Sequence, residues 1–153
     1  MTLSRASDIE LAQKYGLSET VRAIDGGGDF LEIMYTFSKE VGIDRAIEIL
    51  KEEENPKWVY LFTYNNINKI SEKQLGILCG VICRATAVSK QAKWAYWFAL
   101  YIKITDKQFD DLWNTISETC TAEQKLQYAR MFLFHTVELP LRQRKKIRAV
   151  INN

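Results

Sequence analysis

Few side chains in this sequence are of the types that usually carry catalysis. Asp110 and Asp111 are a carboxylate pair of the kind that acts in hydrolysis. Adjacent residues on a helix point about 100° apart, however, which favours two surface acids. His135 ends the apolar run Met131–His135, with no serine or cysteine pattern around it for a triad. We therefore expect no catalytic residue.

The cysteines do not complete a ligand set for the commonest structural metal. Cys79 and Cys83 are four residues apart, so they share one helical face, while Cys120 is remote in sequence. Structural zinc takes four nitrogen or sulfur ligands, and the chain has one histidine. No metal and no cofactor are expected. Three cysteines, an odd number, argue against a disulfide framework and favour a reducing, cytoplasmic setting.

Aromatic side chains are stronger candidates for binding. Trp58 and Trp94 occupy the same place in two copies of a repeat, and helix-spaced aromatics mostly pack, so both are expected in the core. Trp97 and Tyr101 stand where the earlier copy has Leu61 and Asn65. These two residues, where the copies differ, are candidates for binding a partner.

Two tyrosines recur in register with those tryptophans. Tyr60 and Tyr96 lie about 200° around the helix from Trp58 and Trp94, on another face. Such residues either define a binding surface or contact the neighbouring hairpin. Both tyrosines are candidate partner-binding residues, with the packing alternative open.

Five cations crowd one C-terminal segment, within seven residues. A nucleic acid or an acidic protein is a possible partner, because phosphate contacts come mostly from lysine and arginine. The alternative is a solvated terminal helix that gives the last repeat a polar outer face. The five residues are Arg142, Arg144, Lys145, Lys146 and Arg148.

Bulk composition is that of a globular domain, with 153 residues, 47% hydrophobic and 26% charged. The net charge of +2 hides an asymmetry: residues 1–55 hold 6 basic and 12 acidic residues, and residues 56–153 hold 15 and 7. No apolar run is long enough for a membrane span, and the N-terminus lacks the apolar core of a secretory signal. No membrane association is expected.

The segment Lys57–Phe62 returns 36 residues later as Lys93–Phe98, and both copies read Lys-Trp-x-Tyr-x-Phe. A capping box at Ser71, with glutamine three residues on, recurs 34 residues later at Thr105. Apolar residues at positions i, i+3, i+4 and i+7 follow in both copies, which predicts one buried helical face. They are Leu75, Leu78, Cys79 and Ile82, and then Phe109, Leu112, Trp113 and Ile116.

The N-terminal part predicts shorter helices. Ser7 has the form of a capping box, and Ser18 is expected to cap a second helix. Gly26–Gly28 breaks the helical pattern and is a candidate hinge. Asp29 and Asp44 are expected to cap the two helices that follow.

These elements predict an all-α single domain over residues 1–153, with about 9–10 helices and no strand pattern. The periodicity favours a short right-handed stack of antiparallel helical hairpins. Residues 1–28 are expected to form an N-terminal helical cap and glycine hinge. The hairpins are expected at 29–54, 55–87, 88–119 and 120–153.

The pattern resembles HEAT-like repeats, and more closely the tandem Tyr/Trp-x-Tyr-x-Phe helical repeats of uncharacterised bacterial and phage proteins. The resemblance covers roughly residues 30–151. Such repeats usually act as binding scaffolds, so the resemblance implies an α-solenoid that binds rather than catalyses.

Three classes of function follow as expectations. The first is a non-catalytic protein-interaction module, a small bacterial or phage-encoded adaptor or inhibitor of a larger partner. The alternative is a nucleic-acid-binding protein that uses the basic C-terminal two thirds. A weaker alternative is an enzyme like the helical-repeat DNA glycosylases, with Asp111 beside Trp113 as its one echo.

Overall fold

A computed structural model describes residues 2–135 and 139–152. Within these two ranges the chain forms ten α-helices and one 3-10 turn and no strand, which confirms the all-helical fold class. The helices are α1 (Thr2–Lys14), α2 (Ser18–Asp25), α3 (Phe30–Val41), α4 (Ile43–Glu53), α5 (Pro56–Asn65), α6 (Glu72–Ser89), α7 (Ala92–Tyr101), α8 (Asp106–Thr119), α9 (Ala122–His135) and α10 (Leu141–Asn152), and the 3-10 turn η1 is Ile67–Lys69.

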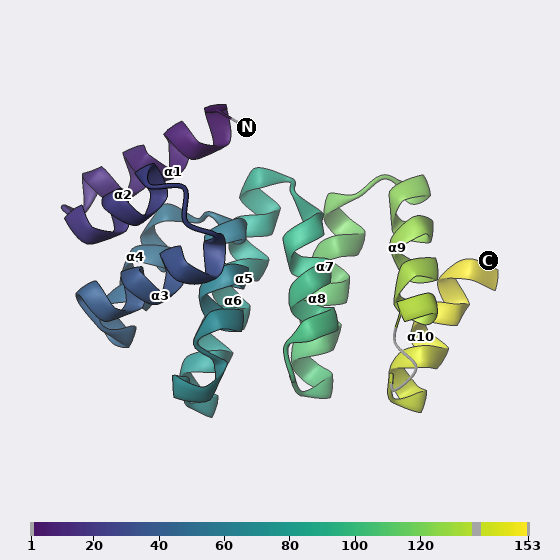
Figure 1. The fold of residues 1–153 in the computed structure, drawn as a ribbon. Coiled ribbons are helices and arrows are strands. Elements are labelled where there is room, and N and C mark those ends of the chain that lie inside the picture. The colour runs from purple at the N-terminus through teal and green to yellow at the C-terminus, as the bar shows by residue number, and fades with distance from the viewer. Residues whose placement is uncertain (1, 136–138, 153) are drawn as a thin grey trace.

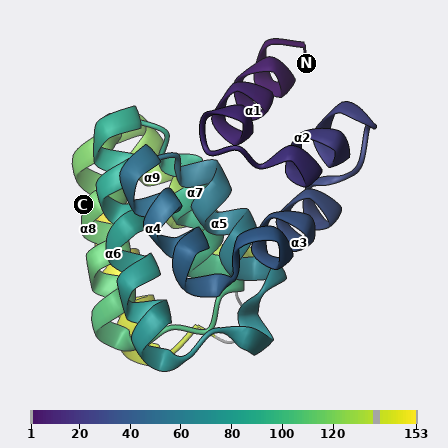
Figure 2. The same cartoon turned by 90° about the vertical axis from the view of Figure 1, so that its left-hand side faces the viewer.

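Alternate helices line up in two rows. Helices α3, α5 and α7 pack one after another in the first row, and α4, α6 and α8 do so in the second. Each first-row helix also packs on the helix that follows it, so the pairs α3–α4, α5–α6, α7–α8 and α9–α10 lie side by side (Figure 1). Viewed from the N-terminal end, α6 and α8 lie on one side and α1 to α3 on the other (Figure 2).

The core lies where the rows meet. Phe37 of α3 packs edge-on against Trp58 and Phe62 of α5, with ring centroids 5.3 and 5.8 Å away. At the other end, Phe132 of α9 packs against Phe109 of α8 at 5.5 Å. All five rings are fully buried. Each large apolar side chain buried in this way stabilises the fold by roughly 1.5–3 kcal/mol.

The helix starts that the repeat predicts are confirmed. At the start of α6, the Gln74 amide donates to Ser71 Oγ at 3.1 Å and the Ser71 amide donates back to Gln74 Oε1 at 2.9 Å. Thr105 and Thr121 make the same reciprocal pairs at α8 and α9. Asn55 caps α5, with proline in the first turn. Because capping boxes are local, their sequence form is sufficient to place them.

The capping box expected at Ser7 is wrong. Helix α1 begins at Thr2, so Ser7 lies inside it. The neighbouring Asp8 is buried and faces α5, where its carboxylate accepts a hydrogen bond from Trp58 Nε1 at 2.8 Å and pairs with Lys57 Nζ at 2.9 Å. This long-range contact, rather than a local cap, explains an acid at this position.

A second contact ties α1 to the end of α4. Glu53 accepts hydrogen bonds from Lys14 Nζ at 2.7 Å and from the Tyr15 hydroxyl. Burial and the hydrogen bond to Glu53 raise the pKa of Tyr15. Burial alone favours a raised pKa for Glu53, but the bonds from Lys14 and Tyr15 lower it.

The cap expected from Ser18 is also wrong. Helix α2 has no side-chain capping bond from its own N-cap residue. Instead, Glu40 of α3 accepts from the amides of Glu19 and Thr20 at 3.1 and 3.0 Å and from the Thr20 hydroxyl at 2.7 Å. A carboxylate at a helix N-terminus is also favoured by the helix dipole.

Of the two caps expected for the next two helices, one is confirmed and one is wrong. Asp29 caps α3 as expected, accepting from the Glu32 amide at 2.9 Å. Asp44 does not cap α4; the N-cap is Gly42, and Asp44 lies in the first turn. Gly42 has φ +84°, a conformation open to glycine and costly for other residues, so it ends α3 and begins α4.

The Gly26–Gly28 segment is a closed turn. The amides of Gly26, Gly27 and Gly28 donate to carbonyls of α2 at 2.8, 3.2 and 3.1 Å. Gly27 has φ +80°, a conformation that strains other residues. A Cβ at Gly28 would lie 3.1 Å from the backbone carbonyl oxygen of Ala23, so a larger residue there needs a small shift of the turn.

Candidate functional site

The repeated tyrosines Tyr60 and Tyr96 are buried, so the expectation that they lie on a face away from the core is wrong. Tyr60 packs against Trp94 of the next first-row helix, at 6.2 Å between centroids. Tyr96 likewise packs against Tyr128 and Phe132 of α9, at 5.1 and 4.6 Å. Each tyrosine therefore contacts the neighbouring hairpin, which is the packing alternative. Burial raises the pKa of both to about 12.

Trp58 and Trp94 differ although they share a repeat position. Trp58 is fully buried, as the sequence predicts, and its indole N–H is satisfied by Asp8 of α1. Trp94 is only half-buried, so its assignment to the core is correct in part. Trp58 contacts both Asp8 of α1, at the N-terminal end of the rows (Figure 1), and Phe37 of α3.

A connected set of aromatic rings lies along α5 and α7. Trp94 packs edge-on against Trp97 at 5.1 Å, and Tyr60 lies 6.0 Å from Trp97 and 5.9 Å from Tyr64. Tyr64 and Tyr101 are 45% and 59% exposed. Tyr101 lies four residues after Trp97 on α7, so the two side chains share one helical face.

A lysine completes this surface. Lys93 Nζ lies 4.9 Å from the ring of Trp94 and 4.7 Å from that of Trp97, in cation–π geometry. We call the set the aromatic face; it consists of Tyr60, Tyr64, Lys93, Trp94, Trp97 and Tyr101. Tyr64 was not identified from the sequence, although it follows Tyr60 at the spacing that separates Trp97 from Tyr101.

The aromatic face opens at one end into a pocket. The pocket has a volume of about 370 Å³ and lies between the start of α7 and α9. Lys93 and Trp94 belong to both the face and the pocket. Lys90, Gln91, Ala92, Cys120, Gln124 and Tyr128 complete the lining. The pocket thus carries two lysines and no carboxylate among its lining residues.

The charged residues of α5 and α7 are all lysines. Neither α5 nor α7 contains an acidic residue, and residues 73–105 carry five cations and no carboxylate. The five cations are Lys73, Arg84, Lys90, Lys93 and Lys103. Arg84 is paired with Glu54 at 3.3 Å, which reduces its share of the positive field. The aromatic face therefore lies in a region of positive charge.

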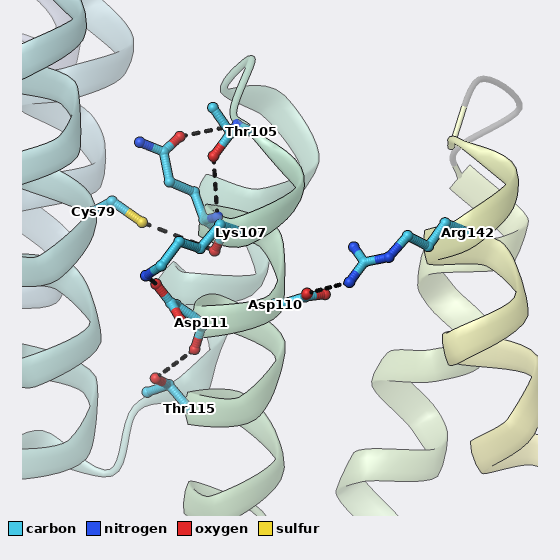
Figure 3. A network of polar contacts seen from close by, with 8 residues as sticks. Cys79, Thr105, Lys107, Asp110, Asp111, Thr115 and Arg142 are labelled. Carbon is cyan, nitrogen blue, oxygen red and sulfur yellow. Dashed lines mark hydrogen bonds and ion pairs between the residues drawn. The ribbon is translucent and has the colours of Figure 1, made fainter.

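The basic C-terminal cluster is partly used inside the fold. Arg142 Nη2 and Lys146 Nζ of α10 both pair with Asp110 of α8, at 2.9 and 3.1 Å (Figure 3 shows the Arg142 contact). Partial burial favours a raised pKa for Asp110, but the bonds from Lys146 and Arg142 lower it. Lys145 and Arg148 are exposed, whereas Arg144 is half-buried and has a partner.

The two adjacent carboxylates point to different neighbours. Asp110 faces α10, whereas Asp111 pairs with Lys107 on its own helix at 3.3 Å (Figure 3). His135 is exposed at the end of α9, where its ring contacts Phe134. Over residues 2–135 and 139–152 these candidate catalytic groups are thus not brought together.

The described residues offer neither a metal-binding cluster nor a helix that could cross a membrane. They contain no group of three or more histidine, cysteine or acidic side chains placed to hold a metal ion. None of the described helices has the length and apolar character needed to cross a membrane. A scan of protein-family models, a search of curated proteins and a search of solved structures find nothing that matches this chain.

Proposed function

We propose that the chain is a non-catalytic protein-interaction module that binds an acidic segment of a larger partner through the aromatic face. In this proposal the helices form a short right-handed α-solenoid of HEAT-like hairpins. The module acts in the cytoplasm as a small adaptor or inhibitor of bacterial or phage origin.

The observation that carries the proposal is a set of linked aromatic rings on helices without carboxylates, in which Tyr64 and Tyr101 are exposed and Trp94 and Trp97 are half-buried. Tyrosine and tryptophan dominate the residues that contribute most to protein-binding energy, and they act best in clusters. Trp97 is half-buried by Tyr60 and Trp94, so its position is fixed before a partner arrives. Such preorganisation lowers the entropic cost of binding.

The chemistry of the partner follows from the charges at the rim. Lys90 and Lys93 line the pocket beside Trp94 and favour a carboxylate there. An apolar or aromatic side chain of the partner would lie on Trp97 and Tyr101. A short acidic segment with aromatic residues is therefore the partner chemistry that we propose.

A second candidate is single-stranded nucleic acid, because aromatic rings beside cations also stack bases and contact phosphates. The pairing of Arg142 and Lys146 with Asp110 reduces the charge that α10 offers to phosphates. For this reason we favour the protein partner.

Affinity capture with matched variants tests the proposal. The wild-type chain should retain one stoichiometric partner from its native host, and Trp97→Ala/Tyr101→Ala should lose it. Phe134→Ala is the matched control, since Phe134 is 80% exposed at the end of α9 and should leave capture unchanged. Equal capture of the partner by all three chains would show that the aromatic face does not bind it. Tight binding of a labelled single-stranded oligonucleotide at low salt, lost in the same double variant, would favour the second candidate.

A further inference from the structure

A different site lies in the second row, between α6 and α8. Four small residues of α6 follow one another at positions i, i+3, i+4 and i+7 and so share one face: Gly76, Cys79, Gly80 and Cys83. In the next repeat, 34 residues on, three of these four positions hold bulkier side chains: Asp110, Trp113 and Asn114. The small residues of α6 leave open space beside α8.

That space is a groove of about 470 Å³. Close packing of α8 does not require the glycines, because a Cβ at Gly80 would meet nothing within 4 Å and one at Gly76 would meet only Gln108 Nε2 at 3.9 Å. Both cysteines line the groove, opposite Lys107, Gln108 and Asp111 of α8. Figure 3 shows Cys79 beside Lys107 and Asp111.

The two thiols act on each other. Cys79 is buried and Cys83 is half-buried, and they lie within hydrogen-bonding reach of one another. The Cys79 thiol also lies 3.9 Å from the Gln108 carbonyl oxygen. The two thiols thus lie beside one another on the same wall of the groove.

We propose that Cys79 and Cys83 form a two-thiolate site for one soft monovalent metal ion of the copper(I) class. Thiolate ligands select such ions, which accept two sulfur donors without needing four. Binding replaces the two thiol protons: Cys79–SH and Cys83–SH with Cu⁺ give a Cys79–S–Cu–S–Cys83 centre of charge −1 and two H⁺. No electron is transferred. Lys107 and Asp111, which also line the groove, pair with one another at 3.3 Å.

This site does not rest on the proposed function, because it involves neither α5 nor α7. Zinc is not the ion proposed, since the described residues place no third histidine, cysteine or acidic ligand with the two thiols. Cys120 lines the pocket beside α7 and provides an internal control.

Competition for copper(I) tests the site. In anaerobic buffer, the wild-type chain should withdraw one equivalent of copper(I) from its coloured bicinchoninate complex. Cys79→Ser and Cys83→Ser should each lose more than about 100-fold in affinity, beyond the 10–100-fold that outer-shell changes cost. Cys120→Ser should bind as the wild type does. Failure of the wild type to withdraw copper, or equal binding by Cys83→Ser, would overturn the proposal.

A second measurement uses the unaltered chain, since Cys79→Ser places a hydroxyl at a buried position and lowers stability. Phenylarsine oxide condenses with two neighbouring thiols and releases one water, which bridges both sulfurs with one arsenic. Mass spectrometry after alkylation should show Cys79 and Cys83 protected together while Cys120 is alkylated. Alkylation of Cys83 at the untreated rate would contradict a paired site.

Discussion

Trp58 Nε1 donates a hydrogen bond of 2.8 Å to Oδ1 of Asp8, fifty residues earlier in the chain. The other oxygen of the same carboxylate pairs with Lys57 Nζ at 2.9 Å, and both side chains of this pair are largely buried. One acid of α1 therefore satisfies the first two residues of the Lys-Trp-x-Tyr-x-Phe motif. The second copy of the motif, at Lys93 and Trp94, has its lysine over the tryptophan ring instead.

Replacing Asp8 with alanine should destabilise the fold by about 3–5 kcal/mol, because it removes the carboxylate that accepts from a buried indole N–H and pairs with a largely buried ammonium. Asp8→Asn should cost less, since its amide oxygen can still accept from Trp58. Urea unfolding followed by circular dichroism measures both. Equal midpoints for wild type and Asp8→Ala would show that α1 does not stabilise the repeat through this carboxylate.

The start of α2 gives a test that separates local from tertiary capping. Ser18→Ala should leave stability unchanged within about 0.5 kcal/mol, because the Ser18 side chain makes no capping bond. Glu40→Ala should cost roughly 1–2 kcal/mol, since three hydrogen bonds at the start of α2 are lost. Thermal unfolding of the two variants decides the matter. A larger loss of stability from Ser18→Ala would show that Ser18 caps α2 locally, as the sequence suggests.

Tyr96 predicts a contrast between losing a hydroxyl and losing a ring. The ring is buried against Tyr128 and Phe132, so Tyr96→Ala should cost about 3–5 kcal/mol. Its hydroxyl has no hydrogen-bond partner among the described residues, so Tyr96→Phe should be close to neutral. Denaturant unfolding gives both values. A loss above about 2 kcal/mol for Tyr96→Phe would show that the hydroxyl has a partner.

The bond between α8 and α10 should weaken in acid. The folded pKa of Asp110 lies below its unfolded value, so its contribution to stability is present above the unfolded pKa of about 3.9 and is lost as pH falls through the folded pKa. The stability difference between wild type and Asp110→Asn should therefore be constant from pH 7 to about 5 and shrink below pH 4. A stability difference that grows as the pH falls would contradict a lowered folded pKa for Asp110.

Local features of the fold could be predicted from the sequence. The boxes at Ser71, Thr105 and Thr121 involve residues three apart, and the buried faces of α6 and α8 depend on one helical period. These contacts need no knowledge of the neighbours. The repeat itself was visible because the copies Lys57–Phe62 and Lys93–Phe98 keep the residues that pack.

Contacts between hairpins could not be predicted in the same way. Ser7 was read as a local cap and Asp8 beside it was given no role, because the partners of Asp8 are about fifty residues away; Glu40 was not connected with α2. Tyr60 and Tyr96 were placed outside the core because one helical face was taken as buried. A helix with neighbours in its own row and in the other row buries two faces.

In the candidate site, Trp97 and Tyr101 were identified because the copies differ there, and their role in binding remains a prediction. Nothing in the sequence indicated that two of the five cations of α10 pair with Asp110. That pairing joins residues on different helices, 32 and 36 positions apart.

The affinity of the purified partner for Trp97→Ala/Tyr101→Ala, measured by calorimetry beside wild type and Phe134→Ala, tests the central claim most directly. Two aromatic hot spots of about 2 kcal/mol each predict a loss of roughly 100-fold or more, with unchanged helicity and a wild-type affinity for Phe134→Ala. An affinity of the double variant within about twofold of wild type would show that the aromatic face does not bind the partner.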